Sequence, residues 1–181
     1  MISRHPFTRI LSAYRDKFEG KGNDDPRYYE FGRKIVEKYR SEKDKKRIKS
    51  EKATFKEFVN FLIDTKVKND RHWKPVYWLT LPCGYNYTVF GKQETFSDDT
   101  NYIINTFNLK GAEPVWENRN AGNKDGDLLQ TYYKQINKEE LQDLYRLYHL
   151  DFRVFDYDYE PFISYVGYST LDDQYDESTY Q

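Results

Sequence analysis

The sequence has a single cysteine, Cys83, no long apolar run and almost no net charge. One cysteine excludes a disulfide within the chain, so Cys83 is expected to be a buried thiol or to have its partner in a segment outside this sequence. No stretch approaches the ~20 apolar residues that cross a bilayer, and no charged start leads into an apolar run as in a signal peptide. The 29 Lys and Arg residues nearly balance the 30 Asp and Glu residues. This balance argues against a general nucleic-acid or membrane-surface binder, which usually carries a basic excess.

The polar composition is offset by aromatic residues. Mean hydropathy is -1.01, but 18 Tyr, 12 Phe and 3 Trp supply bulky material for a core. The length of 181 residues fits one domain. We expect that domain to span residues 1–166, with residues 41–52 as a charged, solvated insertion or helix extension. Residues 167–181 are acidic and polar and are expected to be a disordered tail.

The N-terminal segment predicts the end of a strand at residues 2–3, followed by a helix. Pro6 suits the first helical turn. Apolar side chains then recur at helical spacing at Phe7, Ile10, Leu11, Tyr14 and Phe18. The other side of this helix carries Thr8, Ser12 and Arg15. Gly20 and Gly22 are expected to stop it.

The remaining elements follow from local signals. Helices are expected at about 27–40, after the capping-box pair Thr54 and Glu57, from about 97, and after Asn137 and Glu140. Residues 76–81 are apolar and predict a strand or a buried loop, and residues 87–90 predict a short strand. Residues 69–75 and 110–127 are expected to be loops.

The strongest candidate site is the segment RHPFTRILSAYR, residues 4–15. Arg4 precedes a helix N-terminus, where free N–H groups and the helix dipole favour an anion. The planar guanidinium of Arg4 can hold two phosphate oxygens, and Ser12 can donate a hydroxyl hydrogen bond two turns later. The alternative is an ordinary amphipathic helix with a proline start and a surface arginine.

The same segment resembles the 3'-phosphate-binding motif of sulfotransferases. More narrowly, it is similar to the Golgi carbohydrate sulfotransferases, which include the chondroitin and dermatan 4-O-sulfotransferases. Further blocks agree with that family in order and spacing: SAYRDKF (12–18), TFKEFV (54–59), FLID (61–64), HWKP (72–75), PC (82–83), FGKQET (90–95), DTNYI (99–103) and LYRLYHLDF (144–152). The resemblance covers nearly all of residues 2–162.

The resemblance implies an α/β fold of the P-loop nucleotide-kinase-like type, with a sheet flanked by helices. It implies transfer of a sulfuryl group from 3'-phosphoadenosine 5'-phosphosulfate (PAPS) to a sugar hydroxyl of a glycan, without a metal and without nucleic acid as a partner. Arg4 and Ser12 would bind the 3'-phosphate of the donor. Location would be the luminal side of the Golgi membrane, with the membrane reached only through an N-terminal anchor outside this sequence.

The histidines have competing interpretations. His72 is a candidate catalytic base, because histidine suits proton abstraction near neutral pH, or it is a structural hydrogen-bonding residue. His5 is expected to brace the turn from strand to helix, and His149 to cap the end of a helix. Glu94 is expected to be structural or to contact substrate.

The sequence departs from the family pattern in two places. The family's earlier strand, with a Lys-bearing loop that cradles the 5'-phosphosulfate, has no counterpart before Arg4. A fragment of an active enzyme is the leading interpretation, and the chain alone is then expected to transfer no sulfate. An inactive copy acting as a non-catalytic glycan- or nucleotide-binding module is the alternative. Thr80 stands where the family usually has a cysteine, which puts a family-type disulfide at Cys83 in question. Residues 86–88 form a glycosylation sequon, which would suit a luminal protein.

Overall fold

The computed structural model describes residues 1–20, 25–47, 52–68, 70–114 and 125–167. In chain order the elements are β1 (Ile2–Ser3), α1 (Pro6–Tyr14), the π-helical segment η1 (Arg15–Glu19), α2 (Pro26–Tyr39), α3 (Glu42–Arg47), α4 (Phe55–Thr65), α5 (Val76–Thr80), β2 (Gly91–Lys92), α6 (Phe96–Thr106), α7 (Asp125–Tyr133), α8 (Lys138–Val154) and α9 (Glu160–Ile163).

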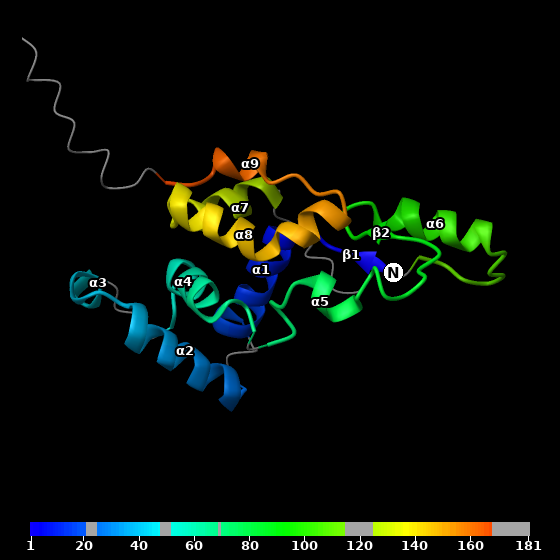
Figure 1. Cartoon of the computed structure of the whole chain (residues 1–181). Coiled ribbons are helices and arrows are strands. Elements are labelled where there is room, and N and C mark those ends of the chain that lie inside the picture. Colours follow the sequence, from blue (N-terminus) through cyan, green and yellow to red (C-terminus); the bar gives the residue numbers. More distant parts are fainter. Residues whose placement is uncertain (21–24, 48–51, 69, 115–124, 168–181) are drawn as a thin grey trace, which may run out of the picture.

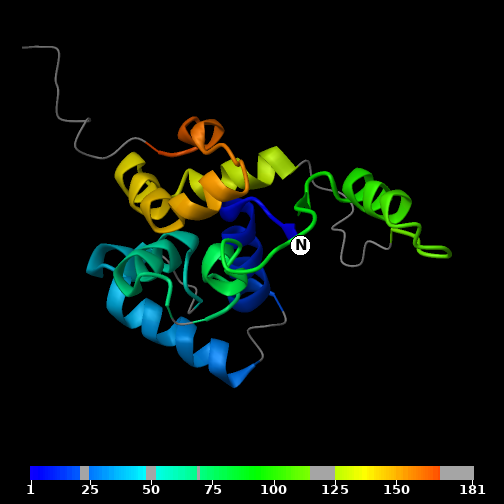
Figure 2. The ribbon, with the colours of Figure 1, turned by 45° about the vertical axis from the view of Figure 1, so that its right-hand side comes forward.

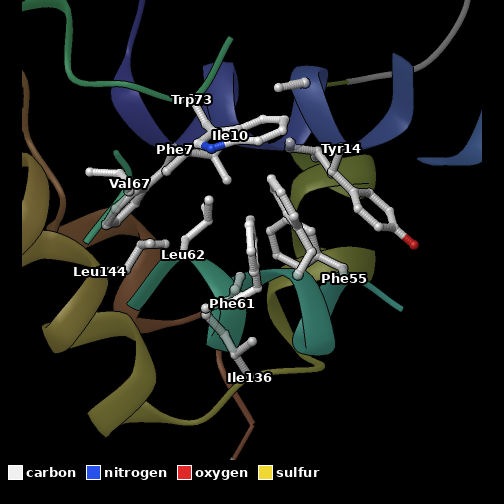
Figure 3. Packing of buried hydrophobic residues seen from close by; sticks show 14 of the residues in the cluster. Phe7, Ile10, Tyr14, Phe55, Phe61, Leu62, Val67, Trp73, Ile136 and Leu144 are labelled. Atoms are coloured by element: carbon white, nitrogen blue, oxygen red, sulfur yellow. The ribbon is translucent and has the colours of Figure 1, made fainter. Parts of the chain in front are cut away.

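Helix α1 lies at the centre of the molecule, with α2 and α4 on one side and α7 and α8 on the other (Figures 1 and 2). It contacts α4, α7 and α8 directly. Its buried face carries Phe7, Ile10, Leu11 and Tyr14, as the helical spacing predicted. Figure 3 shows Phe7 and Ile10 in one cluster with Leu62 of α4 and Leu144 of α8. The core of the domain is therefore built around α1.

Aromatic rings fill much of this core. Trp73 is fully buried. Five rings surround it at centroid distances of 5.4–6.4 Å, from Phe18, Tyr28, Phe31, Phe58 and Phe61. Most of these pairs are edge-to-face, an arrangement that aromatic quadrupoles favour. A polar sequence thus forms a dense core because its apolar area is concentrated in large rings.

The predicted capping box at Thr54 and Glu57 is present, and Asn137 and Glu140, which were predicted to open a helix, form a second one. At α4, Thr54 accepts from the Glu57 N–H and Glu57 accepts from the Thr54 N–H. At α8, Asn137 and Glu140 make the same reciprocal pair. These contacts satisfy N–H groups that a helix start would otherwise leave without partners.

The sheet consists of β1 and β2, which pair in parallel with Ile2 opposite Gly91 and Ser3 opposite Lys92. Within the described residues the fold is therefore mixed, rich in helix and with a small parallel sheet. The prediction of a strand at residues 87–90 was wrong by a few residues, because pairing with β1 selects residues 91–92. A strand end at residues 2–3 is confirmed.

Residues 76–81 were predicted as strand or buried loop, and that prediction was wrong. Val76–Thr80 forms the short helix α5. The reason is distant in sequence: the Asp151 carboxylate, on α8, accepts hydrogen bonds of 2.7 Å from the N–H groups of Val76 and Tyr77. The side chains of Trp78 and Leu79 are exposed rather than buried.

Other differences lie at the surface. Cys83 is exposed, which corrects the expectation of a buried thiol. Helix α6 begins close to the predicted position but extends away from the core (Figure 1), and Tyr102 on it is 61% exposed. Helix α7 was not predicted, and its first residues, 125–127, fall at the end of the expected loop 110–127.

Four expected regions lie partly outside the described residues: 48–51 of the charged insertion, 168–181 of the tail, residue 69 of the loop 69–75 and 115–124 of the loop 110–127. Gly22, one of the two expected stops of the first helix, also lies outside them. The described part of the insertion holds the short helix α3. None of the helices that the structure describes is long and apolar enough to cross a membrane.

Arg40 and Glu57 form the buried ion pair of the domain core. Their side chains are 5% and 7% exposed, and two contacts of 2.8 and 3.0 Å join the guanidinium to the carboxylate. Arg40 also donates to the Lys52 carbonyl oxygen. Glu57 therefore neutralises a buried cation and caps α4 with the same carboxylate.

We expect Glu57→Gln to lower the free energy of unfolding by about 3–5 kcal/mol, because removal of one charge leaves the other buried and uncompensated. Asp143→Asn, which removes the exposed pair with Arg146, is the matched control and should cost less than about 1 kcal/mol. Urea denaturation of both variants measures the difference. Equal losses of unfolding free energy in the two variants would show that the buried Arg40–Glu57 pair stabilises the fold no more than the exposed pair does.

Candidate functional site

Arg4 precedes α1 and Ser12 lies on it, and their spacing through Thr8 in steps of four residues places both on one side of this helix. Arg4 follows β1, and its Nε donates to the Thr8 hydroxyl oxygen at 3.1 Å. Thr8 in turn donates to the His5 carbonyl oxygen. Ser12 follows Thr8 after four residues, a rise of about 6 Å along the helix. Arg4, Thr8 and Ser12 thus form a polar stripe that is partly exposed, opposite the buried face of α1.

This polar stripe combines groups that suit an oxyanion. The Arg4 guanidinium and the Ser12 hydroxyl lie beside the first turns of a helix, where the dipole favours negative charge. Thr8 accepts from Arg4 and donates to the His5 carbonyl oxygen, so it helps to hold the guanidinium. The sequence alone singled out Arg4 and Ser12 but not this contact of Thr8, although Thr8 lies four residues from both.

His5 braces the turn between β1 and α1, and the prediction of this role is confirmed. Its Nδ1 accepts from the Phe7 N–H at 3.1 Å, so His5 is the N-cap of α1. Its Nε2 lies 2.9 Å from the Asp158 carbonyl oxygen. The ring stacks on Phe162 and packs edge-to-face against Phe152. An Nδ1 that accepts and an Nε2 that donates require the neutral ring, and burial lowers the pKa of His5 accordingly.

Arg9 ties the loop that carries His72 to α1. Its two terminal nitrogens donate to the carbonyl oxygens of Lys74 and Arg71 at 2.6 and 2.8 Å. Burial lowers the pKa of Arg9, while Tyr148 and Asp151 act in the opposite direction. Sequence reasoning did not single out this residue, because its partners are backbone atoms more than 60 positions away.

His72 forms a dyad with Asp70. Its Nδ1 lies 2.5 Å from the Asp70 carboxylate and 3.1 Å from the hydroxyl of Tyr28, on α2. Tyr28 also donates to Asp70. A carboxylate at one ring nitrogen fixes the orientation of a histidine and supports proton transfer at the other. The side chain of His72 is about one-third exposed. These contacts are separate from the polar stripe and do not reach Arg4 or Ser12.

The remaining candidates have structural contacts. His149 lies in the middle of α8, with Nδ1 near the Arg146 carbonyl oxygen, and is not the predicted helix-end cap. Glu94 accepts from the His5 N–H and from the Tyr157 hydroxyl. In the described part of the chain, no group of three or more His, Cys, Asp or Glu side chains is placed to hold a metal ion.

We expect the stabilising effect of His5 to disappear as the pH falls. The pKa of His5 is below its ordinary value of about 6.5 in the folded state. The unfolded chain therefore binds more protons as pH drops through that window, which favours unfolding. The groups that face the ring are Glu94, Asp158 and Arg4.

His5→Asn is the test, because asparagine keeps an N-cap acceptor and does not titrate in this range. The difference in unfolding free energy between wild type and His5→Asn should shrink from pH 7.5 to pH 5.5, as measured by urea denaturation. Two stability–pH curves that stay parallel would contradict this role of the neutral ring.

Comparison with known proteins identifies the family to which this chain is similar. A model of the sulfotransferase family matches residues 1–158. Carbohydrate sulfotransferase 11 of Rattus norvegicus is 31% identical over 162 residues, covering 87% of this chain and 46% of that protein. Carbohydrate sulfotransferase 9 of Homo sapiens is 34% identical over 166 residues, covering 85% and 36%. Carbohydrate sulfotransferase 14 of Danio rerio is 32% identical over 172 residues, covering 87% and 43%.

The chain spans less than half the length of these curated relatives. No solved structure matches it. The family match nevertheless includes β1, the polar stripe of α1, the His72 loop and the whole of α8. This chain belongs to the sulfotransferase family.

Proposed function

We propose that the protein is a carbohydrate O-sulfotransferase that transfers a sulfuryl group from PAPS to a hydroxyl of a glycan on the luminal side of the Golgi. Membership of the sulfotransferase family and the names of the relatives support the reaction and the class of acceptor. The observation that carries the proposal is the polar stripe of Arg4, Thr8 and Ser12 at the start of α1, inside the family match.

In this proposal Arg4 and Ser12 hold the 3'-phosphate of the donor. The residues present fit that group, because a guanidinium pairs with phosphate oxygens in a planar fork and a hydroxyl adds one more donor. The parallel β1–β2 pair followed by a helix is also the local arrangement expected of a P-loop nucleotide-kinase-like fold. Bound PAPS supplies the activated sulfuryl group.

His72 is the proposed base. Its Nε2 takes the proton from the acceptor hydroxyl, while Asp70 holds Nδ1 and stabilises the imidazolium that forms. The acceptor oxygen then bonds to sulfur as the bond from sulfur to the bridging oxygen breaks, and adenosine 3',5'-bisphosphate leaves with that electron pair. Arg9 contributes by holding the His72 loop against α1. Positioning of the two substrates carries much of the rate in such a transfer.

We expect Arg4→Ala to weaken binding of adenosine 3',5'-bisphosphate to the full chain about 10–100-fold, because hydrogen bonds to charged groups contribute about 1.5–3 kcal/mol. Ser12→Ala should weaken it about 3–10-fold. Adenosine 5'-monophosphate lacks the 3'-phosphate, so its affinity should not change in either variant. Titration calorimetry with both nucleotides measures this.

Arg146→Ala is the control for charge, since Arg146 is an exposed arginine on α8. It should leave both affinities within about twofold. Equal binding of the two nucleotides by the wild-type chain would contradict the phosphate site.

In a chain supplied with the family's Lys-bearing 5'-phosphosulfate loop, we expect His72→Gln to lower the rate of sulfate transfer from PAPS to chondroitin at least 100-fold, in line with the usual contribution of a general base. Binding of adenosine 3',5'-bisphosphate should be retained. His149→Gln, on the exposed side of α8, should transfer at the wild-type rate. An unchanged rate in His72→Gln would exclude this residue as the base.

The same assays separate the enzyme from a binding module. A chain supplied with the family's Lys-bearing 5'-phosphosulfate loop that binds the bisphosphate but still transfers no sulfate would indicate a non-catalytic nucleotide- or glycan-binding protein. A wild-type chain that transfers sulfate would exclude that alternative.

A further inference from the structure

Two segments that are distant in sequence contact the β1–α1 corner, which consists of Arg4 and His5. One is the turn from β2 to α6, and the other is the segment that follows α8, so three segments lie together. Backbone pairing joins the turn to the end of β1, since the Gln93 N–H donates to the Ser3 carbonyl oxygen at 2.8 Å. The segment that follows α8 is joined to the corner through the Asp158 carbonyl oxygen and His5.

The Glu94 carboxylate links all three segments. Its Oε1 accepts from the backbone N–H of His5 at 2.8 Å. Its Oε2 accepts from the Tyr157 hydroxyl at 3.1 Å, and that hydroxyl is also 3.0 Å from the Ser3 hydroxyl. Both oxygens of one carboxylate are therefore engaged by groups that lie directly beside Arg4.

The Tyr157 ring is itself held in place. Lys92 lies 4.8 Å above it, and the Lys92 ammonium donates to the Asp156 carbonyl oxygen at 2.6 Å. Burial raises the pKa of Tyr157 well above its ordinary value, so the hydroxyl keeps its proton and remains a donor to Glu94. Contacts with Lys92 thus help to hold the ring that carries the hydroxyl donating to Glu94.

We infer that Glu94 is a positioning residue for the phosphate-binding arginine. The peptide between Arg4 and His5 is planar, so a hydrogen bond to the His5 N–H also fixes the orientation of the Arg4 carbonyl and backbone. A fixed backbone restricts where the long Arg4 side chain begins, which reduces the entropy lost when the guanidinium binds an anion. This inference rests on the proposed function, because it concerns the same 3'-phosphate site.

The negative charge of Glu94 has an effect on phosphate binding opposite to that of positioning. A carboxylate near an anion site repels the anion, and this alone would weaken phosphate binding. If repulsion dominates, Glu94→Ala should bind adenosine 3',5'-bisphosphate more tightly than wild type. If positioning dominates, the same variant should bind it more weakly, so the two effects have opposite signs.

The experiment is a double-mutant cycle on the full chain with Glu94→Ala, Arg4→Ala and both together, using adenosine 3',5'-bisphosphate and adenosine 5'-monophosphate as probes. We expect Glu94→Ala to lower affinity for the bisphosphate about tenfold and to leave the monophosphate unchanged. On the Arg4→Ala background, Glu94→Ala should have no further effect, because the side chain that it positions is absent.

Two conservative variants separate positioning from folding. Glu94→Gln keeps an acceptor for the His5 N–H and should restore bisphosphate affinity to within about threefold of wild type. Tyr157→Phe keeps the ring and removes the hydroxyl contact to Glu94, so it should lower affinity about threefold, again for the bisphosphate alone. Thermal unfolding of each variant reports whether the fold is intact.

The outcomes also distinguish the inference from the function on which it rests. Weaker binding of both nucleotides by Glu94→Ala, additive effects in the cycle, or tighter bisphosphate binding would each overturn the positioning role while leaving the phosphate site in place. A wild-type chain without preference for the bisphosphate, or an Arg4→Ala variant that keeps the preference, would instead contradict the proposed function and the inference with it.

Discussion

The burial of one face of α1 is the constraint on which the rest of the structure depends. Phe7 and Ile10 are fully buried, and the hydroxyl of Tyr133 donates to the Phe7 carbonyl oxygen at 2.9 Å. Tyr14 donates in the same way to the Ala53 carbonyl oxygen. A helix fixed in rotation by rings on one side must present its other side at a defined angle. The polar stripe is therefore oriented by the core beneath it.

Polar contacts from α1 and α8 also fix the positions of the loops around α1. Arg9 holds the loop that carries His72, His5 holds the segment after α8, and Asp151 holds the start of α5. Asp151 is buried and Arg9 and His5 are partly buried, so hydrogen-bonding partners offset the cost of their desolvation. These hydrogen bonds to backbone atoms give the loops defined positions, although the loops have no apolar face of their own.

Sequence patterns predicted what depends on neighbours within one or two helical turns. The two capping boxes, the buried face of α1 and the placement of Arg4 and Ser12 on its other side all follow from local spacing. The helix at residues 76–80 did not, because Asp151 lies about 75 positions away. The place of β2 depends on β1, and the Tyr28 contact of His72 depends on how α2 packs. Tertiary contacts of this kind leave no local pattern.

The β1–α1 corner couples the stability of the domain to its proposed chemistry. His5 caps the helix that carries the polar stripe, and its backbone N–H is held by Glu94. Protonation of the ring would remove the Nδ1 acceptor and loosen the first turn of α1, next to Arg4. The burial that lowers the pKa of His5 keeps the ring neutral at near-neutral pH, and the corner therefore keeps its geometry under those conditions. One buried histidine thereby supports both the fold and the position of the anion-binding arginine.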